Sequence, residues 1–206
     1  MTGFPSLSPL GERRQARLAD ARIAVLVGTR RSEGELERYL RELCEASVDI
    51  CRLRDDVATE DELRRAADVF RRVCGEAGAL FVVDRLPGLA VQVGADGAHV
   101  GAVDVDPDHA RRIVGPDLLL GRTVASEQAL GDASDEDVDY LDVDAALVDV
   151  AAARAGQPWF VAGAEDVEEA LRRGARRVLA GSGIEAGSAS EGCWALRRAL
   201  AQHPLR

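Results

Sequence analysis

Eight short apolar segments recur along the chain, and each is followed by a stretch of different character. The segments lie at 21–28, 48–54, 79–84, 97–101, 117–121, 138–144, 158–163 and 176–181. The clearest amphipathic stretches between them are 34–47 and 59–78, and the second begins with Thr59 followed three residues later by Glu62, which is typical of a helix start. Strands that alternate with helices build a parallel sheet. Eight such units in 206 residues predict a single (β/α)8 TIM barrel, an α/β fold, over residues 16–206, preceded by an irregular segment at 1–15.

A doubly wound open sheet is the alternative arrangement of the same elements. Its dinucleotide-binding members carry a G-x-G-x-x-G turn after the first strand. No such turn follows residues 21–28, so a dinucleotide site is not expected.

The charged residues narrow the possible functions. The formal net charge is −10, and all 26 basic residues are arginines, so the chain contains no lysine. We therefore expect no binding to nucleic acid and no lysine-based Schiff-base chemistry. No apolar run approaches the roughly 18 residues of a membrane span, and the first residues lack the apolar core of a secretory signal. We expect a cytoplasmic protein that does not bind membranes.

The four cysteines follow no metal-binding pattern. Cys44 and Cys74 fall in helical patterns and Cys51 in a strand, while Cys193 lies far along the chain, and no C-x-x-C spacing occurs. We expect small buried apolar side chains rather than a metal site or a thiol of lowered pKa. The three histidines form no ligand cluster either.

Several segments together resemble the thiamine phosphate synthase and thiazole tautomerase family. They are DICRLRDD (49–56), GALFVVDR (78–85), GADGAHVG (94–101), GPDLLLGRT (115–123), DVDYLDV (137–143), PWFVAG (158–163) and GARRVLAGSGI (174–184). The resemblance implies a (β/α)8 barrel that joins an aminopyrimidine pyrophosphate to a thiazole phosphate, with Mg²⁺ holding the departing pyrophosphate. Such a site needs cations and metal-binding carboxylates at the carboxyl ends of the strands.

The second and third strands depart from the family pattern. Where the family has Gln-x-Arg-x-Lys, this chain has Arg52, Arg54 and Asp56, so a lysine is replaced by an acid. The family's Asn-Asp-Arg ending, whose Asp binds metal, aligns without gaps with Asp84 and Arg85 in the first two places. A shift of one residue would instead make Asp84 the metal ligand, and both alignments stay open.

The fourth and fifth strands keep more of the pattern. The resemblance makes Asp104 the second metal carboxylate and His99 the family's histidine, although a hydrogen-bonded residue at a strand end is an equal reading of His99. The family's Ser-x-His becomes Thr123 and Ala125. A hydroxyl therefore remains for a phosphate contact, whereas thiazole tautomerase activity is not expected.

The sixth βα unit is shortened. The family's Gly-x-Gly becomes Asp142 and Asp144, and the Thr-Pro-Thr-Lys loop is missing. Strand alternation directs Asp142 and Asp144 into the lumen with Arg52 and Arg54, so we expect lumen-filling acids, Asp56 among them, paired with arginine. Either a structural ion network closes the barrel or the pocket is remodelled for another polar substrate.

The phosphate end agrees better with the family. Gly163 follows the seventh strand, and Gly181 with Ser182 follows the eighth, where backbone N–H groups could hold an anion or glycines could serve tight turns. We expect a phosphorylated small molecule as ligand and Mg²⁺ as a possible cofactor; the oligomeric state is open.

Three functions remain. The first is a diverged transferase that has lost much of the pyrophosphate and Mg²⁺ site, the second a non-catalytic binding or partner protein, and the third an authentic thiamine phosphate synthase with unconventional metal use. An open cavity bordered by Arg54, Asp104 and Ser182 favours an enzyme, and an ion-paired lumen favours the non-catalytic alternative.

Overall fold

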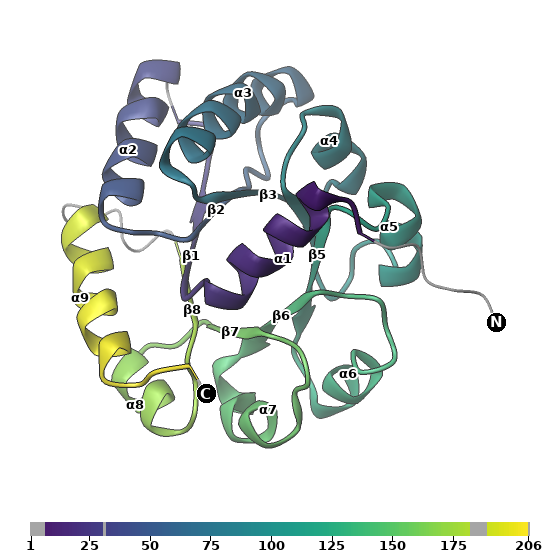
Figure 1. Cartoon of the computed structure of the whole chain (residues 1–206), viewed down its shortest axis with the longest axis vertical. Helices are drawn as coiled ribbons and strands as arrows, with labels where there is room; N and C mark the ends of the chain where they lie inside the picture. Colours follow the sequence, from purple (N-terminus) through teal and green to yellow (C-terminus); the bar gives the residue numbers. More distant parts are fainter. Residues whose placement is uncertain (1–6, 31, 182–188, 206) are drawn as a thin grey trace.

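The computed structural model describes residues 7–30, 32–181 and 189–205. Its strands are parallel and close into a barrel in the order in which they occur along the chain (Figure 1). They are β1 (Ile23–Val27), β2 (Ile50–Leu53), β3 (Leu80–Asp84), β4 (Gly97–Val100), β5 (Leu119–Val124), β6 (Tyr140–Asp144), β7 (Trp159–Ala162) and β8 (Val178–Ala180). Each overlaps one predicted strand, so the barrel prediction is confirmed.

Helices cover the outside of the barrel (Figure 1). They are α2 (Glu33–Glu45), α3 (Glu60–Ala77), α4 (Pro87–Gln92), α5 (Pro107–Val114), α6 (Glu127–Asp132), α7 (Val148–Arg154), α8 (Val167–Arg172) and α9 (Ala189–Ala201). The capping box of Thr59 and Glu62 starts α3, and Gly78, with φ of 77°, ends it. Only the 3-10 turn η1 (Ala145–Leu147) and α7 join β6 to β7, which confirms the shortened sixth unit. In the described ranges no helix is long and apolar enough to cross a membrane.

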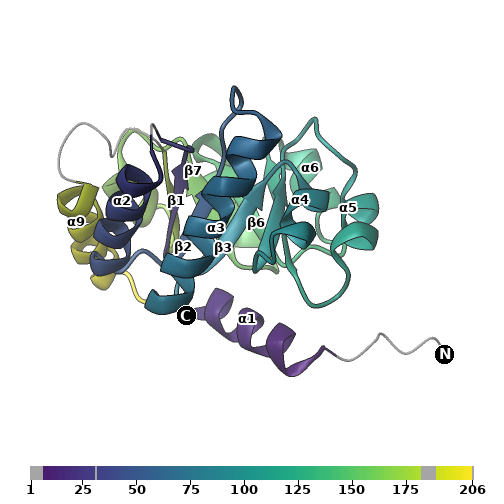
Figure 2. The same ribbon diagram turned by 90° about the horizontal axis from the view of Figure 1, so that it is seen from above.

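A further helix, α1 (Pro9–Asp20), lies across the end of the barrel where the strands begin (Figure 2). Ser8 caps it, because its hydroxyl accepts a hydrogen bond from the Gly11 N–H. Arg14 of α1 donates from Nε to Asp96 at 3.0 Å, just before β4. The expected irregular segment at 1–15 is therefore wrong for residues 9–15. The cap and a proline in the first turn make this stretch a helix despite its weak apolar pattern.

The core has two layers. The larger layer packs the outward faces of the strands, such as Cys51 and Leu53, against the helices. The smaller layer fills the lower lumen with Leu18 of α1 and with inward-facing strand residues such as Ile50 and Tyr140. The predicted alternation on β2 and β6 is therefore confirmed at these positions, and it directs Arg52 and Asp142 into the upper lumen.

Candidate functional site

A cavity of about 360 Å³ opens at the carboxyl ends of the strands. Successive strands each contribute one polar side chain to its lining, and the loop after β4 contributes Asp104. An adjoining cavity of about 530 Å³ shares part of this wall. Active sites of this fold form at the carboxyl ends of the strands because the loops there are free to vary. The polar residues come from β2 to β6 and are Arg52, Asp84, His99, Thr123 and Asp142, whereas β1, β7 and β8 contribute Leu26, Ala162 and Leu179.

Arg52 lies in the lumen directly beneath this cavity. Its side chain is buried, its Nη2 lies 2.6 Å from Oδ1 of Asp84, and its Nη1 contacts Oδ2 of Asp142. Burial alone lowers the pKa of Arg52, but Asp142, Tyr140 and Asp84 raise it above its usual value, so the guanidinium keeps its charge. The predicted pairing of Arg52 with an aspartate of the sixth strand is confirmed for Asp142.

His99 is the next buried polar group in the lumen. Its Nε2 lies 2.9 Å from Oγ1 of Thr123 and 3.3 Å from Oδ2 of Asp142. Burial lowers the pKa of His99 well below its usual value, and the nearby charges of Arg52 and Arg54 lower it further. The imidazole is therefore neutral at neutral pH. Since Nδ1 has no hydrogen-bond partner among the described residues, we place the proton on Nε2, where both oxygens accept it.

At the rim, the charges continue outward from the lumen. Arg54 Nη1 lies 3.5 Å from Oδ2 of Asp84, and its Nη2 lies 3.1 Å from Oδ2 of Asp56. Arg85 Nη1 lies 3.1 Å from Oδ1 of Asp56, and its Nη2 lies 3.0 Å from Oδ1 of Asp104. Acids and arginines thus alternate along the rim and then into the lumen in what we call the charge chain: Asp104, Arg85, Asp56, Arg54, Asp84, Arg52 and Asp142.

The arrangement of the two predicted metal ligands does not suit Mg²⁺. Each oxygen of Asp84 lies against a guanidinium, that of Arg52 or that of Arg54. Asp104 contacts Arg85 through Oδ1 and accepts a hydrogen bond from the Gly101 N–H through Oδ2 at 2.8 Å. Mg²⁺ requires several free oxygen ligands in an octahedron, and these carboxylates are already occupied by cations.

Two of the three predicted lumen-filling acids lie elsewhere. Asp144 is exposed at the end of β6, where its Oδ1 accepts a hydrogen bond from the Ala146 N–H at 2.8 Å and caps η1. Asp56 lies in the loop that follows β2, two residues after Arg54. It is at the exposed rim, with 57% of its side chain accessible. Both predictions are wrong for one reason: alternation places a side chain in the lumen only where neighbouring strands enclose it, and these residues lie at or past a strand's end. Of the three predicted acids, Asp142 alone fills the lumen.

The predicted phosphate end is only partly described. Gly163 has φ of 69°, in the left-handed region that favours glycine, and its backbone faces open space. Gly181 follows β8 and is exposed. Ser182 lies outside the described residues. The role of these three residues in phosphate binding stays a prediction.

Arg85 is the site residue whose role sequence reasoning missed. The gapless alignment placed it in the position of a metal carboxylate, whereas its guanidinium joins Asp56 to Asp104. Its backbone φ of 66° turns the chain directly after β3 and separates it from Asp84, which faces the lumen. Left-handed backbone at an arginine carries no sequence signal, so this position could not have been found from the pattern.

The parallel strands and the polar cavity at their carboxyl ends place this protein in the class of (β/α)8 barrels that carry a site at that end of the barrel. Residues 23–191 match the family described as thiamine monophosphate synthase, and the chain belongs to that family. A thiamine-phosphate synthase of Acidothermus cellulolyticus is 36% identical over 80% of this chain and 87% of its own length. One from Streptomyces avermitilis is 33% identical over 79% and 85%, respectively.

A solved structure extends the likeness to the fold. A thiamine phosphate pyrophosphorylase from Pyrococcus furiosus superposes with a TM-score of 0.80 at 22% identity, covering 91% of this chain and 98% of that one. The predicted family and barrel are confirmed, and membership is consistent with a transferase.

Proposed function

We propose that the chain binds a phosphorylated small molecule at the mouth of the barrel and catalyses, at a reduced rate, the transfer after which its relatives are named. In that reaction the bond from the pyrimidine's carbon to pyrophosphate breaks, and a bond from the same carbon to the thiazole nitrogen forms. The proposal rests on membership of the family and on a cavity whose volume suits a small ligand.

The cations available to such a ligand are the guanidinium groups of Arg54 and Arg85. Their side chains are 39% and 41% accessible, so both can exchange a carboxylate partner for a phosphate group without leaving the rim. The Thr123 hydroxyl borders the same cavity and can donate to a phosphate oxygen. These groups position the ligand and neutralise the departing charge, which is most of what a dissociative transfer requires.

The reduced rate follows from the charge chain. Asp84 and Asp104 are held by arginines rather than free for a divalent ion, and the buried Arg52 fills lumen space. The pairing of Asp84 and Asp104 with arginines is the observation that supports the loss of much of the usual pyrophosphate and Mg²⁺ site. It also supports a second candidate, a non-catalytic barrel that only binds its ligand, because a fully paired interior needs no substrate to satisfy it.

The deciding experiment is an assay of the purified chain with both substrates, with and without Mg²⁺, together with rescue of a bacterial strain that lacks thiamine phosphate synthase. We expect slow product formation that depends weakly on Mg²⁺. A rate equal to that of the Acidothermus cellulolyticus relative would establish an authentic synthase instead. Calorimetry with thiazole phosphate, thiamine phosphate and pyrophosphate tests binding separately. The absence of a heat of binding with all three ligands would reject a phosphate site. We propose a cytoplasmic location for this activity and no role for nucleic acid or membranes.

A further inference from the structure

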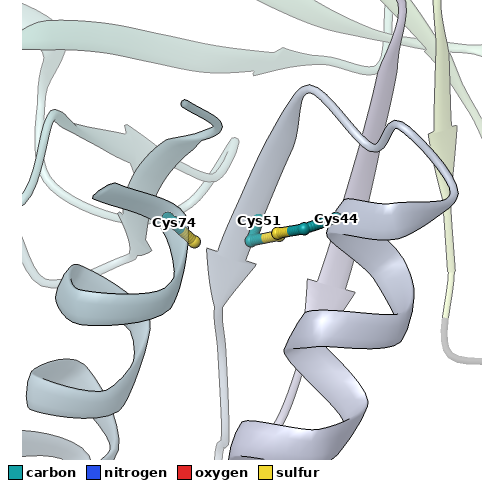
Figure 3. A group of neighbouring side chains, drawn as sticks. All are labelled: Cys44, Cys51 and Cys74. Carbon is teal, nitrogen blue, oxygen red and sulfur yellow. The ribbon is translucent and has the colours of Figure 1, made fainter. Parts of the chain in front are cut away.

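Three cysteines that are far apart in the sequence lie together on the outer side of the barrel. Cys44 is in the last turn of α2, Cys51 is on the outward face of β2, and Cys74 is near the end of α3. Their sulfur atoms all lie within 4.8 Å of one another. Figure 3 shows Cys44 and Cys74 directed towards β2 from its two sides. The burial expected of Cys51 and Cys74 is confirmed, whereas nothing in the sequence pattern indicated that the three thiols meet.

The distances suit a single bound ion. With metal–sulfur bonds of about 2.3 Å, three sulfurs on one zinc ion lie about 3.8–4.0 Å from one another. The present limit of 4.8 Å exceeds that separation by about 1 Å at most, so side-chain rotations would bring all three sulfurs onto one ion. Within the described ranges no histidine or carboxylate joins the group. A donor set of sulfur alone selects soft cations and disfavours Mg²⁺ or Ca²⁺.

Access and charge also favour a cation at this place. Cys44 borders a surface cavity of about 300 Å³ that is also lined by Arg41, Glu45 and Glu76. Thiol ligands release their protons when a metal binds, and the cavity gives those protons a route to solvent.

We propose that Cys44, Cys51 and Cys74 form a binding site for one thiophilic cation of the zinc or copper(I) type, separate from the cavity at the barrel mouth. Three metal–sulfur bonds form, and each thiol that binds gives up its proton to solvent. For a divalent ion the bound site carries one negative charge. Arg41, whose charge acts on Cys44, partly compensates it. The ion would fasten α2, β2 and α3 together at one point.

The test uses the full-length chain, reduced and freed of metal with a chelator, and titrated without oxygen. Cd²⁺ reports thiolate binding through its ultraviolet charge-transfer absorption, and Cu⁺ is supplied in a second titration against a competing chelator. We expect saturation at one ion per chain, with the thiol protons released as Cd²⁺ binds, measured in weak buffer. The absence of a charge-transfer band, or unchanged binding when Cys44 is removed, overturns the proposal.

Variants separate the site from general thiol chemistry. Cys44→Ala changes the half-buried member and should keep the fold, which circular dichroism checks, while lowering Cd²⁺ affinity by about 100-fold or more. Cys193→Ala removes the remaining cysteine, a buried one on α9, and should leave the titration unchanged. A different outcome is that oxygen in air oxidises two of the three thiols to a disulfide and that added metal does not prevent this. The cluster would then be a redox pair, and the proposal would be wrong.

Discussion

Arg52 spans the barrel, because its guanidinium contacts Asp84 on the neighbouring strand β3 and Asp142 on β6, at the opposite side of the closed sheet. All three side chains are almost completely buried. A cation with two acids in such a place neutralises groups that could not remain charged alone. The bridge fixes the depth of the cavity above it.

Replacing Arg52 should therefore be costly. Arg52→Met leaves two buried carboxylates without their shared cation, and we expect a loss of about 3–5 kcal/mol in the free energy of unfolding. Chemical denaturation measures this loss. Arg54→Met serves as the control, because Arg54 is 39% accessible and its pairs should contribute about 1 kcal/mol or less. Equal losses in the two variants would contradict the bridging role.

Folding stability should depend on pH through His99. Its pKa is lowered first by burial and then by Arg52 and Arg54, from an ordinary value of 6.5. Below that pH the unfolded chain binds a proton at His99 that the folded chain does not bind. The contribution of His99 to the free energy of unfolding is therefore complete above pH 6.5 and is lost as the pH falls. Below pH 6.5 the free energy of unfolding of the wild type should fall, relative to that of His99→Gln, by up to about 1.4 kcal/mol per pH unit. Parallel curves for the two proteins would refute this.

Removing the charge of Arg85 should open the rim to divalent ions. Arg85→Gln frees Asp56 and Asp104 from their common partner, so we expect tighter Mn²⁺ binding and weaker pyrophosphate binding, each by about tenfold, in calorimetry. Arg38→Gln is the matched control, since Arg38 lies on α2 with a side chain 74% accessible. A similar change in that variant would point to net charge rather than to the site.

Gly121 of β5 has no room for a side chain. A Cβ there would overlap Cζ of Tyr140 and lie 2.5 Å from Nδ1 of His99. We expect Gly121→Ala to cost about 1–3 kcal/mol or more and to lower the melting temperature. Gly131→Ala, on α6 with open space around it, should instead stabilise by up to about 1 kcal/mol. Stabilisation by both alanines would mean that the lumen yields to the new methyl group.

The two aspartates of β6 should behave differently. Asp144→Ala removes only the cap of η1, so we expect a cost of about 1 kcal/mol and unchanged ligand binding. Asp142→Ala deprives buried Arg52 of one partner and should cost several times more. Chemical denaturation of both variants under the same conditions measures the two losses in the free energy of unfolding. An equally large loss for Asp144→Ala would mean that the side chain of Asp144 lies in the lumen.

The barrel could be predicted because strand and helix periods differ and recur in every unit. The same alternation predicted the inward direction of Arg52 and Asp142, where neighbouring strands enclose both residues. It gave wrong positions for Asp56 and Asp144, since alternation describes a strand and not the loop that follows it.

The remaining features depend on contacts between distant parts of the chain. The Cys44, Cys51 and Cys74 cluster comes from two helices and a strand, and its spacing resembles no local metal motif. The role of Arg85 depends on a turn that arginine rarely adopts. In each case the residue types were visible in the sequence, but their meeting was set by tertiary packing.

Helix α1 gives the barrel a floor, and that floor lies outside the family match, which begins at residue 23. A chain shortened to the matched residues would expose the lower lumen to water from beneath and lose the burial of Leu18, about 1.5–3 kcal/mol on its own. The packed strand residues of the lower lumen, such as Ile50 and Tyr140, would then have a face exposed to water. Any assay of this protein's chemistry therefore needs the helix that the family match leaves out.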